Sequence, residues 1–286
     1  MLTIIQVQVT SISISNDEQK VLIFTNTKRV WRLNTKGDYW VLDIAKGSLT
    51  QLGTSLPEAS LMFAKFSPDG KAVAYVSDNN IYVEDLNTSE IKALTTDGST
   101  TLINGTFDWA YEEEFGCRDG FRWSPDGSKI AFWQIDATKI RDYFMLNTTD
   151  SNYSKIIPVE YPKVGESPSP AKIGVANVSS GQIKWMQING DPQQHYLTRM
   201  EWSGINQLIL QQLNRKQQES KLMYCNATDG NSYTFWAEND DAWVDLNSAD
   251  ILWQSGGFNW INNKQEFIWI SEKDGWRHIY KISKDG

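Results

Sequence analysis

The sequence contains few of the residues that build metal and disulfide sites. Its 286 residues include two cysteines, Cys117 and Cys225, and two histidines, His195 and His278. Two cysteines form at most one disulfide, and these four residues lack the close spacing that zinc ligands show. We therefore expect no metal site and no cofactor, two buried thiols, and two histidines with structural roles.

Positive charge is also scarce. Lysine and arginine total 27 against 35 aspartates and glutamates, which leaves a formal net charge of −8. The phosphates of nucleic acids repel a chain with net negative charge, so the composition argues against a nucleic-acid partner.

Long apolar runs are missing, whereas aromatic residues are plentiful. No run approaches the roughly 18 to 20 residues that span a bilayer. Residues 1–9 are apolar but lack the basic start and the small-residue cleavage site of a signal peptide, so they predict a first strand. The 13 tryptophans, 11 tyrosines and 11 phenylalanines suit the half-buried faces of sheets, and we expect an all-β fold.

A hairpin signature recurs along the chain. In its fullest form an aromatic residue is followed by Ser-Pro-Asp-Gly and then by an apolar strand, as in 66–76 and 123–133. Proline presets φ for such a turn, and glycine tolerates the positive φ that the turn requires. Weaker copies bring the total to five, with anchor residues at Ile14, Phe66, Trp123, Trp202 and Trp260.

The spacing of these anchors predicts a β-propeller. Neighbouring anchors lie 52, 57, 79 and 58 residues apart, which is enough for four strands and generous loops in each repeat. Outer hairpins are predicted at 38–52 and 80–95. We therefore expect a propeller of four-stranded antiparallel blades over 1–286, with about five blades present. An insertion around 141–181, which we expect to project from its blade, would account for the longest step.

One acidic segment interrupts the repeats. Phe107–Phe115 carries three adjacent glutamates between aromatic residues. Asp108 can N-cap a short helix over 108–114, and the acids that follow suit the positive end of a helix dipole. Taken alone, such a charge run is typical of a solvated surface turn, so its context decides its interpretation.

The sequence resembles the N-terminal propeller of the dipeptidyl peptidase IV family, within the prolyl oligopeptidase-like serine peptidases. One match is Asp108–Phe115, with Ser124–Gly127 shortly after it. Further matches follow in the same order: Tyr161–Glu166, Gln212–Arg215, Ala242–Asp245 and Ser271–Tyr280. Together these motifs span nearly the whole chain.

This resemblance implies a partial propeller. Family members have an eight-bladed propeller that caps an α/β-hydrolase domain, so we expect that C-terminal domain to be a partner within the same protein. The alternative, from the repeats alone, is a five-bladed ring closed by residues 1–9. The resemblance also favours a periplasmic or extracellular location, and a homodimer, because the inserted segment lies near subunit contacts in the family.

The resemblance assigns Glu113 and Glu114 to the amino terminus of a substrate peptide. In the family, a glutamate pair on a short propeller helix binds the free amine. An α-amino group with a pKa of about 7.7 to 8.0 is largely an ammonium at neutral pH, and two carboxylates accept charge-assisted hydrogen bonds from it. We therefore expect peptides with a free N-terminus, from which dipeptides are released. Glu112 is expected to be solvated and to make no amine contact.

The hydrolytic residues are not expected in this chain. It has no Gly-x-Ser-x-Gly elbow, and neither histidine follows the Ser, Asp, His order of an α/β-hydrolase. We assign no catalytic residue and expect the chain to be inactive by itself. The family's substrate-steering arginines have no recognisable counterpart, because the stretch after 39–41 offers Lys46 and the loop after Trp243 offers no arginine.

Two other functions fit parts of the pattern. A propeller that only binds other proteins needs no catalytic site. A five-bladed glycosidase would also use tryptophans and paired carboxylates. It needs carboxyls about 5 to 9.5 Å apart on opposite faces of a sugar, and the adjacent Glu113 and Glu114 are poorly placed for that. Binding that depends on a free amine distinguishes the peptidase propeller from both.

Overall fold

The computed structural model describes residues 8–246 and 258–286. The strand expected at residues 1–9, and the ring that it would close, lie almost wholly outside these residues. Apart from one short helix, α1 (Trp109–Phe115), the regular elements of these residues are strands. The described residues fall into two compact units. One unit is drawn from Met1–Thr100, Trp123–Ala131 and Ala176–Ile183, and the other from Thr101–Arg122, Phe132–Val175 and Lys184–Gly286.

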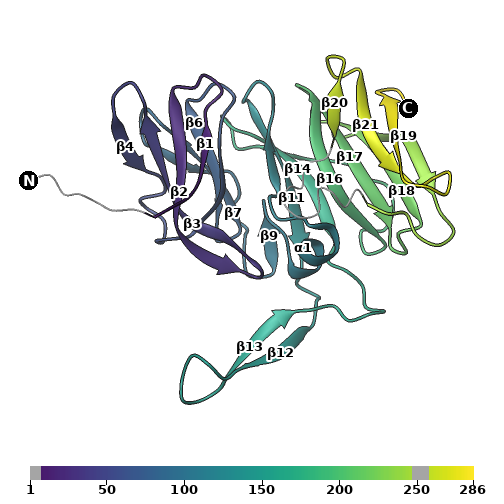
Figure 1. The fold of residues 1–286 in the computed structure, drawn as a ribbon, viewed down its shortest axis with the longest axis horizontal. Helices are drawn as coiled ribbons and strands as arrows, with labels where there is room; N and C mark the ends of the chain where they lie inside the picture. Colours follow the sequence, from purple (N-terminus) through teal and green to yellow (C-terminus); the bar gives the residue numbers. More distant parts are fainter. Residues whose placement is uncertain (1–7, 247–257) are drawn as a thin grey trace, which may run out of the picture. The chain divides into compact units, whose positions relative to one another are not determined.

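The first unit contains two complete blades (Figure 1). The strands of the first are β1 (Val9–Ile14), β2 (Lys20–Val30), β3 (Leu33–Asp43) and β4 (Ser48–Gln51). Those of the second are β5 (Leu61–Phe66), β6 (Ala72–Ser77), β7 (Asn80–Asp85) and β8 (Ile91–Ala93). Each blade is an antiparallel meander, and the outer hairpins predicted at 38–52 and 80–95 are confirmed as β3–β4 and β7–β8.

The two blades are joined where β3 meets β5. Lys36 and Gly37 pair with Met62 and Leu61, which merges the blades into one eight-stranded sheet. A Cβ at position 37 would lie 2.5 Å from the carbonyl oxygen of Thr25. Glycine is therefore required here because β3 passes close to the backbone of β2 in the same blade.

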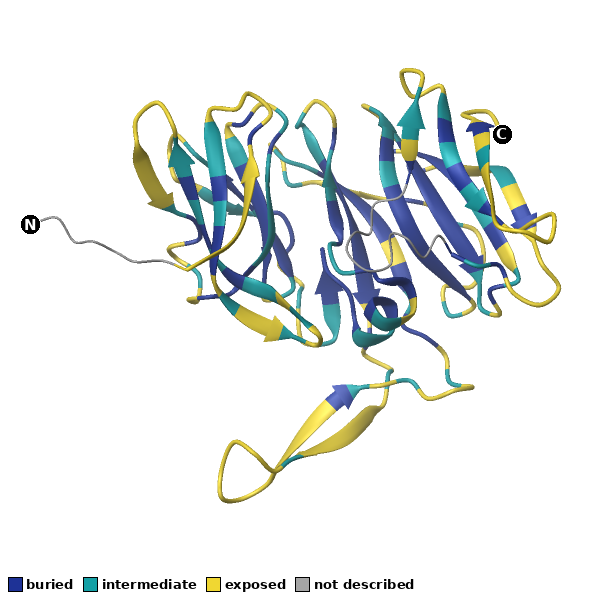
Figure 2. Cartoon of the chain, viewed as in Figure 1, coloured by how far each residue is buried: buried dark blue, intermediate teal, exposed yellow. Residues whose placement is uncertain are grey.

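The third blade carries the insertion. Its strands are β9 (Leu102–Asn104), β10 (Phe121–Trp123), β11 (Lys129–Asp136), β14 (Ala171–Asn177) and β15 (Ile183–Trp185). Between β11 and β14 the chain forms a hairpin of β12 (Asp142–Asn147) and β13 (Lys155–Glu160), which pair only with each other. Figures 1 and 2 show this hairpin extending away from α1 with most of its surface exposed. The range predicted for the insertion, 141–181, also contains β14, which is a strand of the blade because it pairs with β11.

The last two sheets belong to the second unit. One consists of β16 (His195–Gly204), β17 (Gln207–Asn214), β18 (Glu219–Asn226) and β19 (Ser232–Asn239). The other consists of β20 (Asn259–Ile261), β21 (Glu266–Ser271) and β22 (His278–Ser283).

The anchor residues of the repeat occupy equivalent places. Each lies at or near the end of a strand that is followed by its antiparallel neighbour. The anchor pairs are Ile14 with Val21, Phe66 with Val73, Trp202 with Leu208 and Trp260 with Phe267, and Trp123 ends β10 beside β11. The predicted all-β propeller of antiparallel blades is confirmed.

The turns between these strands have a repeated hydrogen-bond pattern. In the second blade the Ser67 hydroxyl donates to Asp69 Oδ1 at 2.7 Å and accepts from the amide of Ala72 at 3.0 Å. In the third, the Ser124 hydroxyl donates to Asp126 Oδ1 at 2.7 Å and accepts from a backbone amide at 2.9 Å. The serine and aspartate of the motif therefore satisfy each other and the turn backbone.

The middle strands hold the apolar core, and most of their residues are buried, as the dark blue in Figure 2 shows. One cluster of the first unit includes Phe24, Tyr39 and Tyr75, and one of the second includes Phe267 and Trp269. Burial of such side chains stabilises the blades at roughly 25 cal/mol per Å² of apolar area.

The sparse cysteines and histidines have structural positions. Cys117 and Cys225 are both buried free thiols, as predicted, and burial raises the pKa of Cys117 to about 11. His195 is buried in β16, where its Nδ1 lies 3.0 Å from Gln212 Nε2. His278 begins β22, and its Nδ1 lies 2.9 Å from a carboxylate oxygen of Asp274.

Candidate functional site

Helix α1 begins at the predicted N-cap. Asp108 Oδ1 accepts from the amide of Tyr111 at 2.9 Å, and Oδ2 accepts from the hydroxyl of Ser169 at 2.6 Å. Burial raises the pKa of Asp108, and these two hydrogen bonds oppose the rise. The helix ends at Phe115, one residue beyond the predicted range, because Gly116 adopts the left-handed conformation of a C-cap with φ of 64°.

Arg199 of β16 holds the other end of α1. Its Nη1 donates to the carbonyl of Phe115 at 3.2 Å and to the carbonyl of Thr198 at 2.8 Å. The side chain is almost fully buried, and its Nη2 has no hydrogen-bond partner among the residues described. A cation at a helix C-terminus is favourable, so α1 is anchored at both ends and its glutamates project from a fixed backbone.

The three glutamates of α1 have three different environments. Glu112 is 6% exposed, and its Oε1 accepts from Arg118 Nε at 2.9 Å. Glu113 is half-buried, and Glu114 is exposed. The expectation that Glu112 is solvated is wrong, because the helix turns this residue inward against an arginine.

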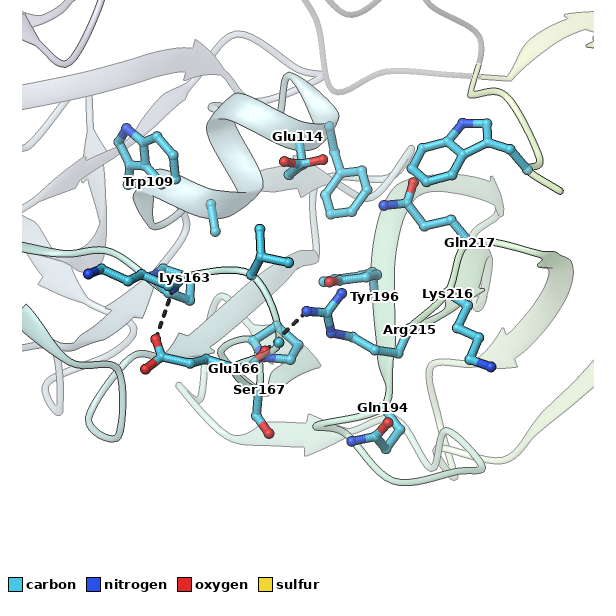
Figure 3. Close-up of a pocket in the computed structure, with 17 residues that line it drawn as sticks. Trp109, Glu114, Lys163, Glu166, Ser167, Gln194, Tyr196, Arg215, Lys216 and Gln217 are labelled. Carbon is cyan, nitrogen blue, oxygen red and sulfur yellow. Dashed lines mark hydrogen bonds between the residues drawn. The ribbon is translucent and has the colours of Figure 1, made fainter.

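A cavity of about 610 Å³ opens beside α1 within the second unit (Figure 3). Glu114 of α1 lines it together with the loop 162–168, Tyr196 of β16, Arg215 after β17 and Trp243. The motifs at 108–115, 161–166, 212–215 and 242–245 therefore meet at one place. Of the two predicted amine-binding residues, Glu114 lines this cavity and Glu113 does not.

The loop after the hairpin returns to α1. The rings of Tyr161 and Trp109 pack with their centroids 4.2 Å apart. The carboxylate of Glu166 accepts from the amide of Lys163 at 2.9 Å and pairs with Arg141 Nη1 at 3.5 Å. Thus β12–β13 projects, whereas the loop that follows it forms a wall of the cavity.

Arg215 places a positive charge at the cavity, and two contacts fix the position of its guanidinium. Its Nη2 donates to the carbonyl of Glu166 at 3.0 Å, and its guanidinium carbon lies 5.7 Å from the ring centroid of Tyr196. Burial raises the pKa of Tyr196, the charge of Arg215 opposes that rise, and the charge of Glu114 adds to it. The carboxylate of Glu114 and the guanidinium of Arg215 thus shift the pKa of Tyr196 in opposite directions within the same cavity.

Sequence reasoning did not assign Arg215, Tyr196 or Lys163 to the site. Arg215 and Lys163 lie within motifs that carry the family resemblance. Those motifs are the feature of the sequence from which the two residues could have been assigned to the site. What the sequence did not reveal is that the loop after the hairpin folds back over α1. Lys46, the one cation offered as a steering residue, belongs to the first unit and pairs with Asp43 at 3.0 Å.

Two kinds of site are not found in the part of the chain that the structure describes. No three His, Cys, Asp or Glu side chains there are grouped to hold a metal ion. None of the helices formed by those residues has the length and apolarity needed to cross a membrane.

Comparison with known proteins identifies the family. Residues 15–286 match the family model described as "Dipeptidyl peptidase IV (DPP IV) N-terminal region". The chain is 29% identical over 281 residues to "Dipeptidyl peptidase 4" of Trichophyton rubrum, covering 94% of this chain and 35% of that protein. It is 30% identical over 215 residues to "Probable dipeptidyl-aminopeptidase B" of Chaetomium globosum, covering 70% of this chain and 23% of that one.

Solved structures agree with this comparison. The crystal structure of Porphyromonas gingivalis dipeptidyl peptidase 4 matches 98% of this chain and 38% of its own, with a TM-score of 0.89 and 27% identity. A putative dipeptidyl aminopeptidase IV from Bacteroides ovatus matches with a TM-score of 0.71 over 94% of this chain and 34% of its own, and at 23% identity it supports the fold. The chain thus spans between 23% and 38% of the length of these relatives.

Proposed function

Because this chain belongs to the family of dipeptidyl peptidase IV N-terminal regions, we propose that it admits peptides to a serine dipeptidyl peptidase and recognises their free amino termini. In this proposal the propeller binds the substrate, and a C-terminal α/β-hydrolase domain of the same protein releases the dipeptide. The relatives are nearly three times as long as this chain, which leaves room for such a domain.

One observation carries the amine-binding role. Glu114 stands exposed on a helix anchored at both ends, beside a cavity, and no ion pair or hydrogen bond of its side chain is recorded among residues 8–246 and 258–286. An ammonium would supply the charge that this carboxylate lacks. Glu113, its neighbour on α1, is the second proposed acceptor. Two fixed acceptors would set the distance from the amine to the reacting carbonyl, so that two residues are removed at a time.

The test is made on the intact protein with a chromogenic Xaa-Pro substrate. Glu113→Gln and Glu114→Gln should each lower kcat/KM by about ten- to a hundredfold, because a neutral amide replaces a charged acceptor. Blocking the amine by acetylation should lower the turnover of the unaltered protein and make it insensitive to both substitutions.

The matched control is Glu90→Gln, an exposed carboxylate in the turn between β7 and β8. It should leave kcat/KM unchanged. Equal cleavage of the free and acetylated substrates would contradict amine recognition. The chain would then fit the alternative, a propeller that binds other proteins.

We also propose that the partner of the hairpin β12–β13 is a second copy of this chain. Phe144, Leu146 and Ile156 are 67%, 64% and 65% exposed, and Leu146 pairs with Ile156 across the strands. These three residues share one face of the hairpin. Leu146→Asp should convert the intact protein from dimer to monomer in sedimentation experiments, whereas Asn152→Asp in the exposed hairpin turn should not. A monomeric unaltered protein at micromolar concentration would refute this role.

A further inference from the structure

Arg215 has a charge that no carboxylate of the described residues neutralises. Its one recorded side-chain hydrogen bond goes to a backbone carbonyl, that of Glu166. The carboxylate of Glu166 is engaged elsewhere, by the amide of Lys163 and by Arg141. No ion pair joins Arg215 to Glu114, although both line the cavity.

The position of the guanidinium is well defined. The hydrogen bond to the loop and the Tyr196 ring hold it from two sides, and Figure 3 shows it turned toward the loop and Tyr196. The neighbouring cations are directed elsewhere. Lys216 points away from this group in Figure 3, and the Lys163 ammonium lies 5.7 Å from the ring centroid of Tyr143 on the hairpin. The cavity is therefore dipolar, with Glu114 as its anion and Arg215 as its cation.

From this arrangement we infer that the cavity selects peptides whose first residue has a carboxylate side chain. This inference rests on the proposed amine-binding role of Glu114. With the ammonium at Glu114, the first side chain is the nearest part of the ligand that can carry an opposite charge to Arg215. A planar guanidinium accommodates a carboxylate through two parallel hydrogen bonds, which a neutral amide side chain cannot match.

The main-chain carbonyl of the first residue is the competing acceptor for Arg215. A carbonyl contact would strengthen the binding of every peptide to the same extent and would create no preference among first residues. A carboxylate contact would favour glutamate over glutamine, two side chains of nearly equal size. The ratio of the affinities for peptides that begin with glutamate and with glutamine therefore distinguishes a carboxylate contact from a carbonyl contact.

The experiment measures binding of Glu-pyrrolidide and Gln-pyrrolidide to the intact protein by titration calorimetry. The pyrrolidine ring has neither a C-terminal carboxylate nor a carbonyl that could be cleaved, so the ligand is not hydrolysed and its first side chain is its only anion. The unaltered protein should bind the glutamate ligand about tenfold more tightly. Arg215→Gln should bring the ratio of the two affinities to about one while leaving the affinity for Gln-pyrrolidide nearly unchanged. Arg215→Lys should keep part of the preference, and Lys216→Gln, the matched control, should keep all of it.

Three outcomes would overturn the inference. They are a ratio near one in the unaltered protein, an equal loss for both ligands in Arg215→Gln, and a loss of the preference in Lys216→Gln. The N-acetylated forms of both ligands test the amine role separately. If acetylation does not weaken binding, the proposed amine site fails, and the ratio between the acetylated ligands still reports on Arg215.

Discussion

The blade turns and the α1 region use acidic side chains in opposite ways. In the turns, Asp69 and Asp126 accept hydrogen bonds from a serine two residues earlier and from the turn backbone. Around α1, Asp108 accepts from the amide of Tyr111 and also from Ser169, 61 residues later in the chain, and Glu114 has no side-chain partner among the described residues. The turns are closed locally, whereas the α1 region brings distant segments together and leaves Glu114 without a side-chain partner among the described residues.

The largest effect on the free energy of unfolding is expected from the buried glutamate of α1, Glu112. Glu112→Gln should destabilise the intact protein by roughly 3 kcal/mol, because it leaves the mostly buried Arg118 without its carboxylate. The measurement is the denaturant midpoint, with Glu90→Gln as the control. The double variant Glu112→Gln/Arg118→Gln should recover part of the loss. An unchanged midpoint for Glu112→Gln would show that Glu112 is as open to solvent as Glu114.

A smaller effect is expected in the turns. Ser124→Ala removes a buried hydroxyl that joins Asp126 to the backbone, so it should cost about 1 to 2 kcal/mol of unfolding free energy. Ser48→Ala, on the exposed strand β4, serves as the control and should cost little. Equal midpoints for the two variants would contradict the view that the turn is a closed unit.

The pH dependence of the free energy of unfolding gives a second test of the hydrogen bond between Ser124 and Asp126. The hydrogen bond from Ser124 is the main cause that lowers the pKa of Asp126 from its ordinary 3.8 to about 2. A lowered pKa stabilises the folded state above the ordinary value, and this contribution is lost as the pH falls toward the folded value. The stability difference between Ser124→Ala and the unaltered protein should therefore shrink between about pH 4 and about pH 2.

The same contrast explains what could be predicted from the sequence. The repeat at Phe66 and Trp123 encodes its own turn within a few residues, so strands, turns and the propeller fold could be predicted from local patterns. The N-cap Asp108 could be predicted for the same reason. The burial of Glu112 could not, because it depends on which face of α1 meets Arg118. The cavity role of Arg215 depends on a loop 49 residues earlier in the chain.

The insertion is closed at its base by the blade that carries it. The amide of Asp136, where β11 ends, donates to the carbonyl of Pro170 at 3.0 Å, just before β14 begins. The two ends of the inserted segment are thus already joined at its base, and β11 and β14 pair beneath it. Lengthening or shortening the hairpin leaves the strand order of the blade intact. The pairing that holds the blade together is therefore independent of the length of this arm.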